Sequence, residues 1–551
     1  MADSAGCEWW CDQLDVVVDI RPDQRAVRVE GEMRLTLQVA SSTGPSIAVN
    51  PDQPVMRFEE VTVDGDRDVD VELNAPLPDP PDPLGAGARV AHIRAGPAAF
   101  RRGDQLTLRF VLTSTDESVQ FLVREGFALA SWTQQWLPGV LPRAGEGPGA
   151  WMQSRGRTTF RLPPGWRAVS NGVLVEHAET GTGTTEAWHT DQRVGRSFAA
   201  GPYRSTWHEV DGRRIGVHLL SEQPLDVDQQ LAMLAGALAA QEARFGPYPY
   251  PTYSVVELPD DGVRWYASSE QGFILAVAKA FSFAHGNLPL WAHEMAHGWW
   301  GNRVMTDGPG SLLCDESLAQ YSAVVAIETV EGAAAAREFL DFSRIGYSPL
   351  QCGRGYFELA GRGEDMPLSA MRGEQPWEHH LSDAKGHWVY HMLRQRVGDD
   401  RFFATLRGLL DSFTGRSMRL DDVRAAFAAA APDCDLETFF AQWLDRPGAP
   451  ECDLVWTAGP DRTEVVIRQV QPGEPYALAL ELAVDTAGGR VVHPVDAHQR
   501  ETRLVLPTPG DDVQRVVLDP EHRVLMWRPE YHRPAAAGLA TSRMRAGTDG
   551  S

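Results

Sequence analysis

The sequence has little cysteine, almost no lysine, no cluster of basic residues and no long apolar run. Six cysteines in 551 residues are too few for a disulfide scaffold, and their spacings match no zinc ribbon. Acidic residues outnumber basic ones, and the formal net charge is -24. Binding to a phosphate backbone requires clustered cations, so we expect neither nucleic acid nor an anionic membrane as a partner.

The sequence also lacks the features of secretion and membrane insertion. No segment approaches the ~20 apolar residues of a membrane span, and no basic residue precedes Arg21, as a signal peptide would require. We therefore expect a cytoplasmic protein. The 43% hydrophobic and 23% charged residues are typical of a globular chain. At roughly 150 residues per domain, the length predicts three to four domains.

Hydrophobic periodicity divides the chain. Short apolar alternations with Gly, Asp and Pro between them predict antiparallel strands up to about residue 206, and alternation returns after residue 452. Between these regions the apolar residues follow helical spacing. Helices are expected over 226–244, 288–300, 315–330, 333–345, 384–397, 400–413, 420–430 and 436–444. The predicted parts are an N-terminal β domain (1–205), a mainly helical domain (206–450), a β-sandwich (451–533) and a disordered tail (534–551).

An H-E-x-x-H pattern lies within one of these predicted helices. His293 and His297 are one turn apart on the same helix face, so both imidazoles can bind one Zn²⁺. Glu294 is rotated off that face and is placed to reach a water on the metal. A catalytic zinc site uses three protein ligands, and Glu316, on the next predicted helix, is the candidate third ligand.

The residues around this pattern resemble the gluzincin zinc aminopeptidases, which include alanyl aminopeptidase and the leukotriene hydrolase branch. HEMAHGWWGNRV at 293–304 is similar to the family pattern H-E-x-x-H-x-W-(F/W)-G-N-x-V. DESLAQY at 315–321 is similar to N-E-G-F-A-x-Y, with Asp315 in place of Asn. Further similarity lies at 170–172, 245–251 and 442–448.

The resemblance implies a fold, a metal and a reaction. The fold is multidomain α+β, with an antiparallel β-saddle, a thermolysin-like catalytic domain and a C-terminal β-sandwich. The metal is one Zn²⁺ held by His293, His297 and Glu316. The reaction is hydrolysis of the N-terminal residue of peptides or aminoacyl amides by a zinc-bound water, with Glu294 as general base.

The substrate-binding motif is altered. In the family, the Glu of G-(A/G)-M-E-N binds the free α-amine of the substrate. The corresponding segment here is ASSEQ at 267–271, which keeps only the Glu. Glu270 can still pair with an α-ammonium, since this needs an anionic partner in a partly dry pocket. In the alternative interpretation Glu270 is a surface carboxylate.

A second departure concerns the oxyanion of the reaction. The family places a Tyr two residues before the Lys of Y-x-K-G, and its hydroxyl stabilises the oxyanion. Here Asp383 occupies that place, and an ionised carboxylate would repel a developing oxyanion. The oxyanion could instead be stabilised by zinc alone or by Tyr356, Tyr390 or His387, and the sequence leaves these alternatives open.

Three functional interpretations follow. The first is a zinc aminopeptidase acting on peptides. The second is a specialised zinc amidohydrolase acting on a small aminoacyl conjugate, because both altered motifs lie where a substrate would bind. The third is a catalytically impaired scaffold that binds a partner, but the retained Glu294 argues against it. The first-pocket preference and the oligomeric state are left open.

Overall fold

The computed structural model describes residues 8–50, 53–64, 69–76, 88–95, 100–141, 153–261, 263, 265–344, 346–459, 461–507 and 513–532. The predicted tail, 534–551, lies outside these ranges. The chain forms two compact units. The first combines Met1–Gly332 with Asp400–Ala430, and the second combines Ala333–Asp399 with Ala431–Ser551. The three-domain boundaries predicted from the sequence stay a prediction.

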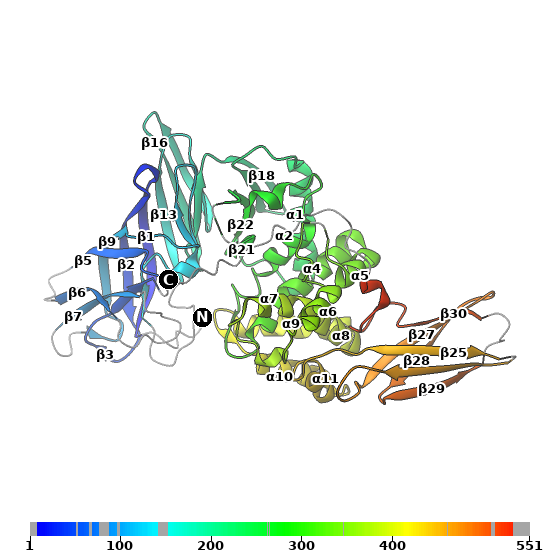
Figure 1. Cartoon of the computed structure of the whole chain (residues 1–551). Coiled ribbons are helices and arrows are strands. Elements are labelled where there is room, and N and C mark those ends of the chain that lie inside the picture. Colours follow the sequence, from blue (N-terminus) through cyan, green and yellow to red (C-terminus); the bar gives the residue numbers. More distant parts are fainter. Residues whose placement is uncertain are drawn as a thin grey trace, which may run out of the picture. The chain divides into compact units, whose positions relative to one another are not determined.

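The N-terminal part of the first unit consists of β-sheets, as predicted (Figure 1). A seven-stranded sheet has the order β15-β16-β13-β1-β2-β9-β5. Its strands are β1 (Trp9–Arg21), β2 (Ala26–Leu37), β5 (Met56–Val63), β9 (Gln105–Ser114), β13 (Gln153–Leu162), β15 (Val173–Thr180) and β16 (Gly183–Gly195). Along β1 every second residue from Leu14 to Ile20 is buried, so this period-two pattern lines one core.

Smaller sheets complete this part. One is β10 (Phe121–Val123), β11 (Ala128–Ala130), β17 (Phe198–Gly201) and β14 (Arg167–Ser170), and another is β12 (Gly139–Val140), β4 (Ser46–Val49), β7 (Arg89–Ala95) and β6 (Val69–Pro76). A short pair joins β3 (Ser41–Ser42) and β8 (Phe100–Arg101). The 3-10 turn Trp132–Gln134 follows β11, and Ser131 caps its N-terminal end.

The first unit also contains a five-stranded sheet that the sequence did not predict. Its order is β18 (Arg204–Val210), β19 (Arg213–Leu219), β20 (Thr252–Leu258), β22 (Phe273–Val277) and β21 (Ala267–Glu270). Every residue of β20 is buried, including the polar Thr252, Ser254 and Glu257, so burial along this strand does not follow the polar and apolar pattern of its sequence. The region after residue 206 is therefore mixed α and β. Strand β21 lies at the sheet edge and pairs only with β22 among the described strands.

The first unit also contains helices. They are α1 (Val227–Phe245), α2 (Leu288–Ala296), α3 (Ser311–Cys314), α4 (Glu316–Glu331), α9 (Asp399–Phe413) and α10 (Leu420–Ala430). Of these, α1 and α2 contact the five-stranded sheet. Strands β23 (Met305–Thr306) and β24 (Ser417–Met418) form a parallel pair. Helix α9 is fixed by Phe402, whose ring lies 5.7 Å from that of Tyr321 on α4 and 5.5 Å from that of Phe427 on α10.

The second unit holds the remaining helices. They are α5 (Ala333–Asp341), α6 (Gly353–Gly361), α7 (Pro376–Leu381), a π-helical turn (Ser382–Gly386), α8 (His387–Val397) and α11 (Leu436–Trp443). The sequence did not predict α6 or α7. His379 and His380 both lie on α7. The helix predicted over 384–397 begins with the π-helical turn.

The C-terminal strands of the second unit form two three-stranded sheets. These are β25 (Cys452–Ala458), β26 (Thr463–Gln469) and β29 (Glu501–Leu506), and β28 (Gly489–Ala497), β27 (Leu478–Thr486) and β30 (Val513–Leu518). The predicted fold class, with β-rich, mainly helical and β-sandwich parts in this order, is confirmed.

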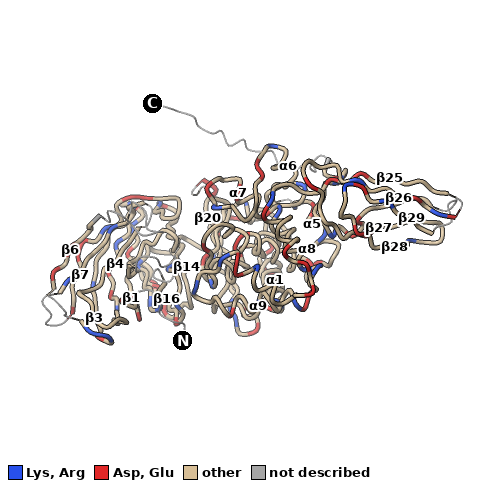
Figure 2. The backbone as a smooth tube through the Cα atoms, turned by 90° about the horizontal axis from the view of Figure 1, so that it is seen from below, with Lys and Arg blue, Asp and Glu red and all other residues tan. Residues whose placement is uncertain are grey.

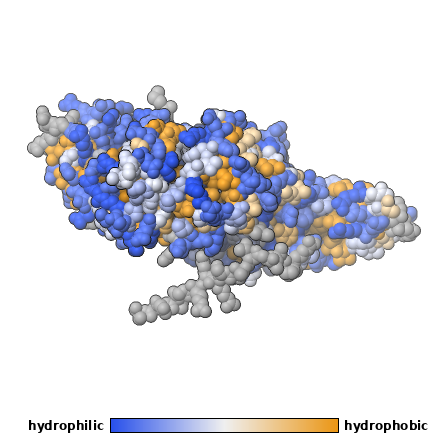
Figure 3. All heavy atoms as spheres, turned by 90° about the horizontal axis from the view of Figure 1, so that it is seen from above, coloured by the Kyte–Doolittle hydropathy of each residue, from blue (hydrophilic) through white to orange (hydrophobic). Residues whose placement is uncertain are grey.

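The surface is polar and carries both signs of charge. Figure 2 shows basic residues spread along the chain between acidic ones. On the face drawn in Figure 3, hydrophobic residues form small groups among hydrophilic ones. Among the residues that the structure describes, no helix has both the length and the apolar content that crossing a membrane requires.

Candidate metal centre

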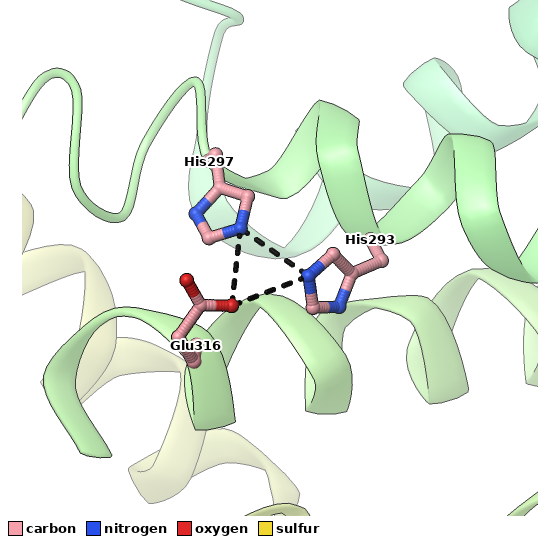
Figure 4. A group of neighbouring side chains, drawn as sticks. All are labelled: His293, His297 and Glu316. Carbon is pink, nitrogen blue, oxygen red and sulfur yellow. Dashed lines mark hydrogen bonds and ion pairs between the residues drawn. The ribbon is translucent and has the colours of Figure 1, made fainter. Parts of the chain in front are cut away.

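Three predicted ligands meet within the first unit (Figure 4). His293 and His297 come from α2 and its C-terminal end, and Glu316 is the first residue of α4. The Nε2 atoms of the two histidines are 3.3 Å apart. Oε2 of Glu316 lies 3.5 Å from Nε2 of His293 and 3.6 Å from Nε2 of His297.

The size of this triangle fits one metal ion. Ligand atoms about 2.0–2.1 Å from a tetrahedral zinc are ~3.3 Å from one another. The measured distances of 3.3, 3.5 and 3.6 Å are close to this value. Two imidazoles and one carboxylate are the donor set of a catalytic zinc that keeps its fourth position for water.

The local sequence explains the position of the two histidines. Asn287 caps α2, because its Oδ1 accepts a hydrogen bond from the amide of Leu290. The helix ends at Ala296, four residues earlier than predicted. The chain then turns tightly, with the amide of Gly298 bonded to the carbonyl of Met295. His297 still has helical backbone angles, so it stays one turn above His293.

Glu316 owes its position to the start of α4. Asp315 precedes it with φ -119 and ψ -85, which is not a helical conformation. Asp315 makes no capping hydrogen bond to α4. Its carboxylate points instead to His297, where Oδ1 lies 2.8 Å from Nδ1. Helices α2 and α4 pack against each other, which brings Glu316 to the histidines.

The second nitrogen of each histidine has its own partner. Nδ1 of His297 lies near Asp315 and 3.1 Å from the carbonyl oxygen of Trp300. Nδ1 of His293 lies 2.9 Å from Oε1 of Gln320, one turn after Glu316 on α4. These oxygens accept hydrogen bonds, so each Nδ1 carries the hydrogen and each Nε2 lone pair faces Glu316. Sequence reasoning missed both partners, although Gln320 is at i+4 from Glu316.

The electrostatics favour a cation at this place. Burial by itself lowers the pKa of His297, but the Glu316 and Asp315 carboxylates outweigh it and raise the pKa well above its ordinary value. A metal ion would take the place of the proton that these carboxylates attract. The second residue of the H-E-x-x-H motif, Glu294, is on α2 beside His293 and is 8% exposed.

Glu270 ends strand β21 and is buried, with 1% of its surface exposed. The alternative of a surface carboxylate is therefore wrong. Its described partners are uncharged. They are the hydroxyls of Ser131, Ser197 and Ser268 and the backbone of Trp132. Burial raises the pKa of Glu270 to about 7, against the lowering effect of these hydrogen bonds.

Asp383 lies in the π-helical turn of the second unit and is fully buried. Its Oδ2 accepts a hydrogen bond of 2.5 Å from Nε2 of Gln351. Two of the open substitutes for the family Tyr are engaged in the same unit. The hydroxyl of Tyr356 donates to Asp365 at 2.9 Å, and Nδ1 of His387 bonds to the carbonyl of Asp383.

Comparisons with known proteins agree with this geometry. Residues 231–443 match the model of the peptidase family M1 domain. The chain is 25% identical over 295 residues to aminopeptidase RNPEPL1 of Homo sapiens, covering 49% of this chain and 39% of that protein. It is 22% identical over 324 residues to aminopeptidase N of Lactobacillus helveticus, covering 53% of this chain and 36% of that protein. The match thus spans less than two fifths of each relative's length.

A solved structure has the same fold. It is the crystal structure of a variant M1 zinc metallopeptidase from Deinococcus radiodurans, with a TM-score of 0.59 and 17% identity over 80% of this chain and 94% of that one. Residues 231–443 are therefore similar to a peptidase family M1 domain, which confirms the resemblance to the gluzincin zinc aminopeptidases predicted from the sequence.

Proposed function

We propose that this protein is a zinc-dependent aminopeptidase that removes the N-terminal residue from peptides or aminoacyl amides. The observation that carries the proposal is the triangle of His293, His297 and Glu316, whose edges of 3.3, 3.5 and 3.6 Å suit one ion. When bound, zinc supplies a Lewis acid that lowers the pKa of a water and polarises the scissile carbonyl. The three side chains would hold that ion through the Nε2 atoms of the histidines and Oε2 of the glutamate.

Glu294 moves the protons of the reaction. It follows His293 directly on α2 and, at ~100° per residue, is turned away from the ligand face. Its carboxylate accepts the proton of the attacking water and then delivers it to the nitrogen of the leaving amine. A carboxylate that shuttles one proton in this way is unchanged after each turnover.

Glu270 binds the amino end of the substrate. A buried carboxylate without a cation is costly, and the described partners of Glu270 are hydroxyls and one backbone group. A substrate ammonium would supply the missing charge. Strand β21 leads to Glu270 along the sheet edge, where an extended peptide can add as a further strand.

Replacing the general base tests the proposal. In Glu294→Gln we expect kcat on aminoacyl amides to fall by about 10²–10⁴, because the amide side chain cannot accept the proton. Bound zinc, measured by elemental analysis, should be unchanged. Glu209→Gln on strand β18, an exposed position of the first unit, is the matched control and should keep its turnover. Full turnover in Glu294→Gln would refute the assignment.

One observation favours a second candidate function. Asp383 stands where the family has a Tyr and is held, fully buried, by Gln351. A specialised zinc amidohydrolase acting on a small aminoacyl conjugate would tolerate this change. Hydrolysis of a panel of aminoacyl fluorogenic amides separates the two functions. Broad activity supports the aminopeptidase, whereas inactivity of the zinc-loaded protein supports the specialised enzyme.

Asp383→Tyr extends this comparison. If a missing hydroxyl limits the reaction, the variant gains turnover on the same panel, because one oxyanion donor is worth ~10²–10³. A zinc-loaded protein that stays inactive on every amide, with and without this change, would favour the binding scaffold. The cytoplasmic location and the single zinc ion are parts of the same proposal.

A further inference from the structure

Two serines from the N-terminal sheets hold one oxygen of Glu270. Oγ of Ser197 donates to Oε2 of Glu270 at 2.6 Å, and Oγ of Ser131 donates to the same oxygen at 3.1 Å. Oε1 accepts a hydrogen bond of 3.4 Å from Ser268 of β21, and the backbone of Trp132 also bonds to the carboxylate. The two oxygens of the carboxylate are therefore unequal, and Oε2 receives both of the shorter bonds.

The backbone fixes the direction of the Ser197 hydroxyl. The amide of Trp132 donates to its oxygen at 2.9 Å, so the hydroxyl hydrogen is left to point to Glu270. The main chain of Ser197 is held on both sides. Its amide donates to Oδ1 of Asn171 at 2.6 Å, and its carbonyl accepts from the hydroxyl of Ser170 at 2.8 Å. The donor is thus in place before any substrate arrives.

The end of β21 is tied to the same group of residues. Nδ2 of Asn171 donates to the carbonyl of Gln271 at 2.8 Å, and Oε1 of Gln271 accepts from the amide of Gly195 at 2.7 Å. Both ends of the Ser197–Glu270 hydrogen bond therefore belong to one rigid, buried network. A carboxylate held in this way loses little rotamer freedom when it binds a cation.

We propose that Ser197 and Ser131 are positioning residues that hold Oε2 of Glu270 and leave Oε1 to bind the α-ammonium of the substrate. This inference rests on the proposed function. Hydroxyls suit the task because they stabilise the carboxylate without neutralising it, whereas an Arg or Lys would compete with the substrate. The specificity for a free amino end is thus shared between the β21 edge and residues more than 70 positions away in sequence.

Ligand binding in the Glu294→Gln background tests the inference, because binding is then measured without turnover. The probes are leucinamide and N-acetyl-leucinamide, titrated by calorimetry into the zinc-loaded protein. The variants are Ser197→Ala, Ser131→Ala and the pair. Thr252→Val is the matched control, because Thr252 Oγ1 donates to the carbonyl of Gly172 at 3.1 Å and is equally buried.

We expect each serine variant to bind leucinamide about tenfold more weakly, because a hydrogen bond to a charged group is lost. The control should change the dissociation constant less than twofold. Zinc content and the thermal midpoint report whether each variant is folded. In the active protein, KM for aminoacyl amides should rise by a similar factor, with kcat changed by less than about threefold.

The outcomes separate the inference from the proposed function. Equal binding of leucinamide by the Glu294→Gln parent and both folded serine variants would overturn the inference alone. A similar loss of leucinamide affinity in Thr252→Val would also overturn the inference. The loss would then follow from removing any buried hydroxyl in this region, and not from removing the hydrogen bonds to Glu270. If the Glu294→Gln parent binds N-acetyl-leucinamide as tightly as it binds leucinamide, Glu270 does not recognise the free amine. The proposed role of Glu270 then fails, and the inference fails with it.

Discussion

Asp315 holds His297 in the orientation that a metal requires, with Oδ1 of the carboxylate 2.8 Å from Nδ1 of the ring. Gly301 makes room for this contact. Its φ is +93, which favours glycine, and an added Cβ would lie 2.4 Å from Oδ1 of Asp315. The family pattern N-E-G-F-A-x-Y has Asn at the position where this chain has the charged Asp315.

We predict that Asp315→Asn binds zinc about 10–100 times more weakly, because an amide makes the imidazole a less basic ligand than a carboxylate does. The dissociation constant is measured by competition with a chelator of known affinity. Asp307→Asn serves as the control, since Asp307 pairs with Arg419 at the surface of the same unit. Equal affinity of Asp315→Asn and the unchanged protein would show that the carboxylate has no such role.

Zinc removal should abolish turnover and lower the thermal midpoint. The three ligands join α2 to α4, and an ion that binds only the folded state stabilises it by mass action. Dialysis against a chelator, followed by calorimetry and by assays with zinc added back, checks both effects. If added zinc restored activity but did not raise the thermal midpoint, the ion would not stabilise the packing of α2 against α4.

Binding of leucinamide to the Glu294→Gln protein should weaken below about pH 7. Burial raises the pKa of Glu270 to about 7, so this acid becomes protonated and neutral as the pH falls through that value. The ligand amine stays protonated there, so the loss belongs to the protein. We expect about a tenfold weaker binding per pH unit below the pKa. In the additional variant Glu270→Gln, binding should be weak and nearly independent of pH. If binding to Glu270→Gln still weakened below pH 7 as in the parent, the titrating group would be a residue other than Glu270.

His218 should make the first unit sensitive to acid. It is buried on β19, with Nδ1 2.8 Å from Oγ of Ser205 and its ring 4.7 Å from that of Trp207. Burial lowers the pKa of His218 to about 3. The unfolded chain takes up the proton near pH 6.5, so stability present above that pH is lost as the pH falls toward 3, by up to about 1.4 kcal/mol per pH unit.

In His218→Phe the thermal midpoint should therefore fall less between pH 7 and pH 4.5 than in the unchanged protein. Phenylalanine keeps the ring packing but has no titrating group. The exposed His208 on β18 provides the control, as His208→Phe removes a histidine that water already solvates. Calorimetric scans across this pH range measure both variants. The same acid response in both would contradict the assignment to His218.

The sequence could predict the metal triangle because its signals are local or strongly constrained. Helical spacing places His293 and His297 on one face, and Glu316 follows at the start of the next helix. Alternation likewise identified the N-terminal strands and the C-terminal sandwich. Helix α7 had a local signal that was missed, namely Pro376 in the first turn and Glu378, whose Oε1 accepts from the amide of Gln375 at 2.9 Å.

Other features had no local signal. Strand β20 is buried along its whole length although it contains Thr252, Ser254 and Glu257, so its sequence does not show that it is a core strand. The π-helical turn at Asp383 depends on tertiary packing. The contacts of Glu270 with Ser131 and Ser197 span 139 and 73 residues, and nothing near either serine indicates them. Sequence patterns predict elements well, but they do not predict which distant hydroxyl meets a buried carboxylate.

The interrupted course of the first unit has a consequence for how the protein is made. All three candidate metal ligands have been synthesised once residue 316 is in place, yet the unit includes Asp400–Ala430, where Phe402 packs on Tyr321 of α4 and Phe427 packs on Phe402. On the ribosome, this half of the molecule has to wait for the whole segment 333–399 before its last two helices emerge. A chain terminated before residue 400 would carry every candidate ligand and still leave Tyr321 of α4 without its contact to Phe402.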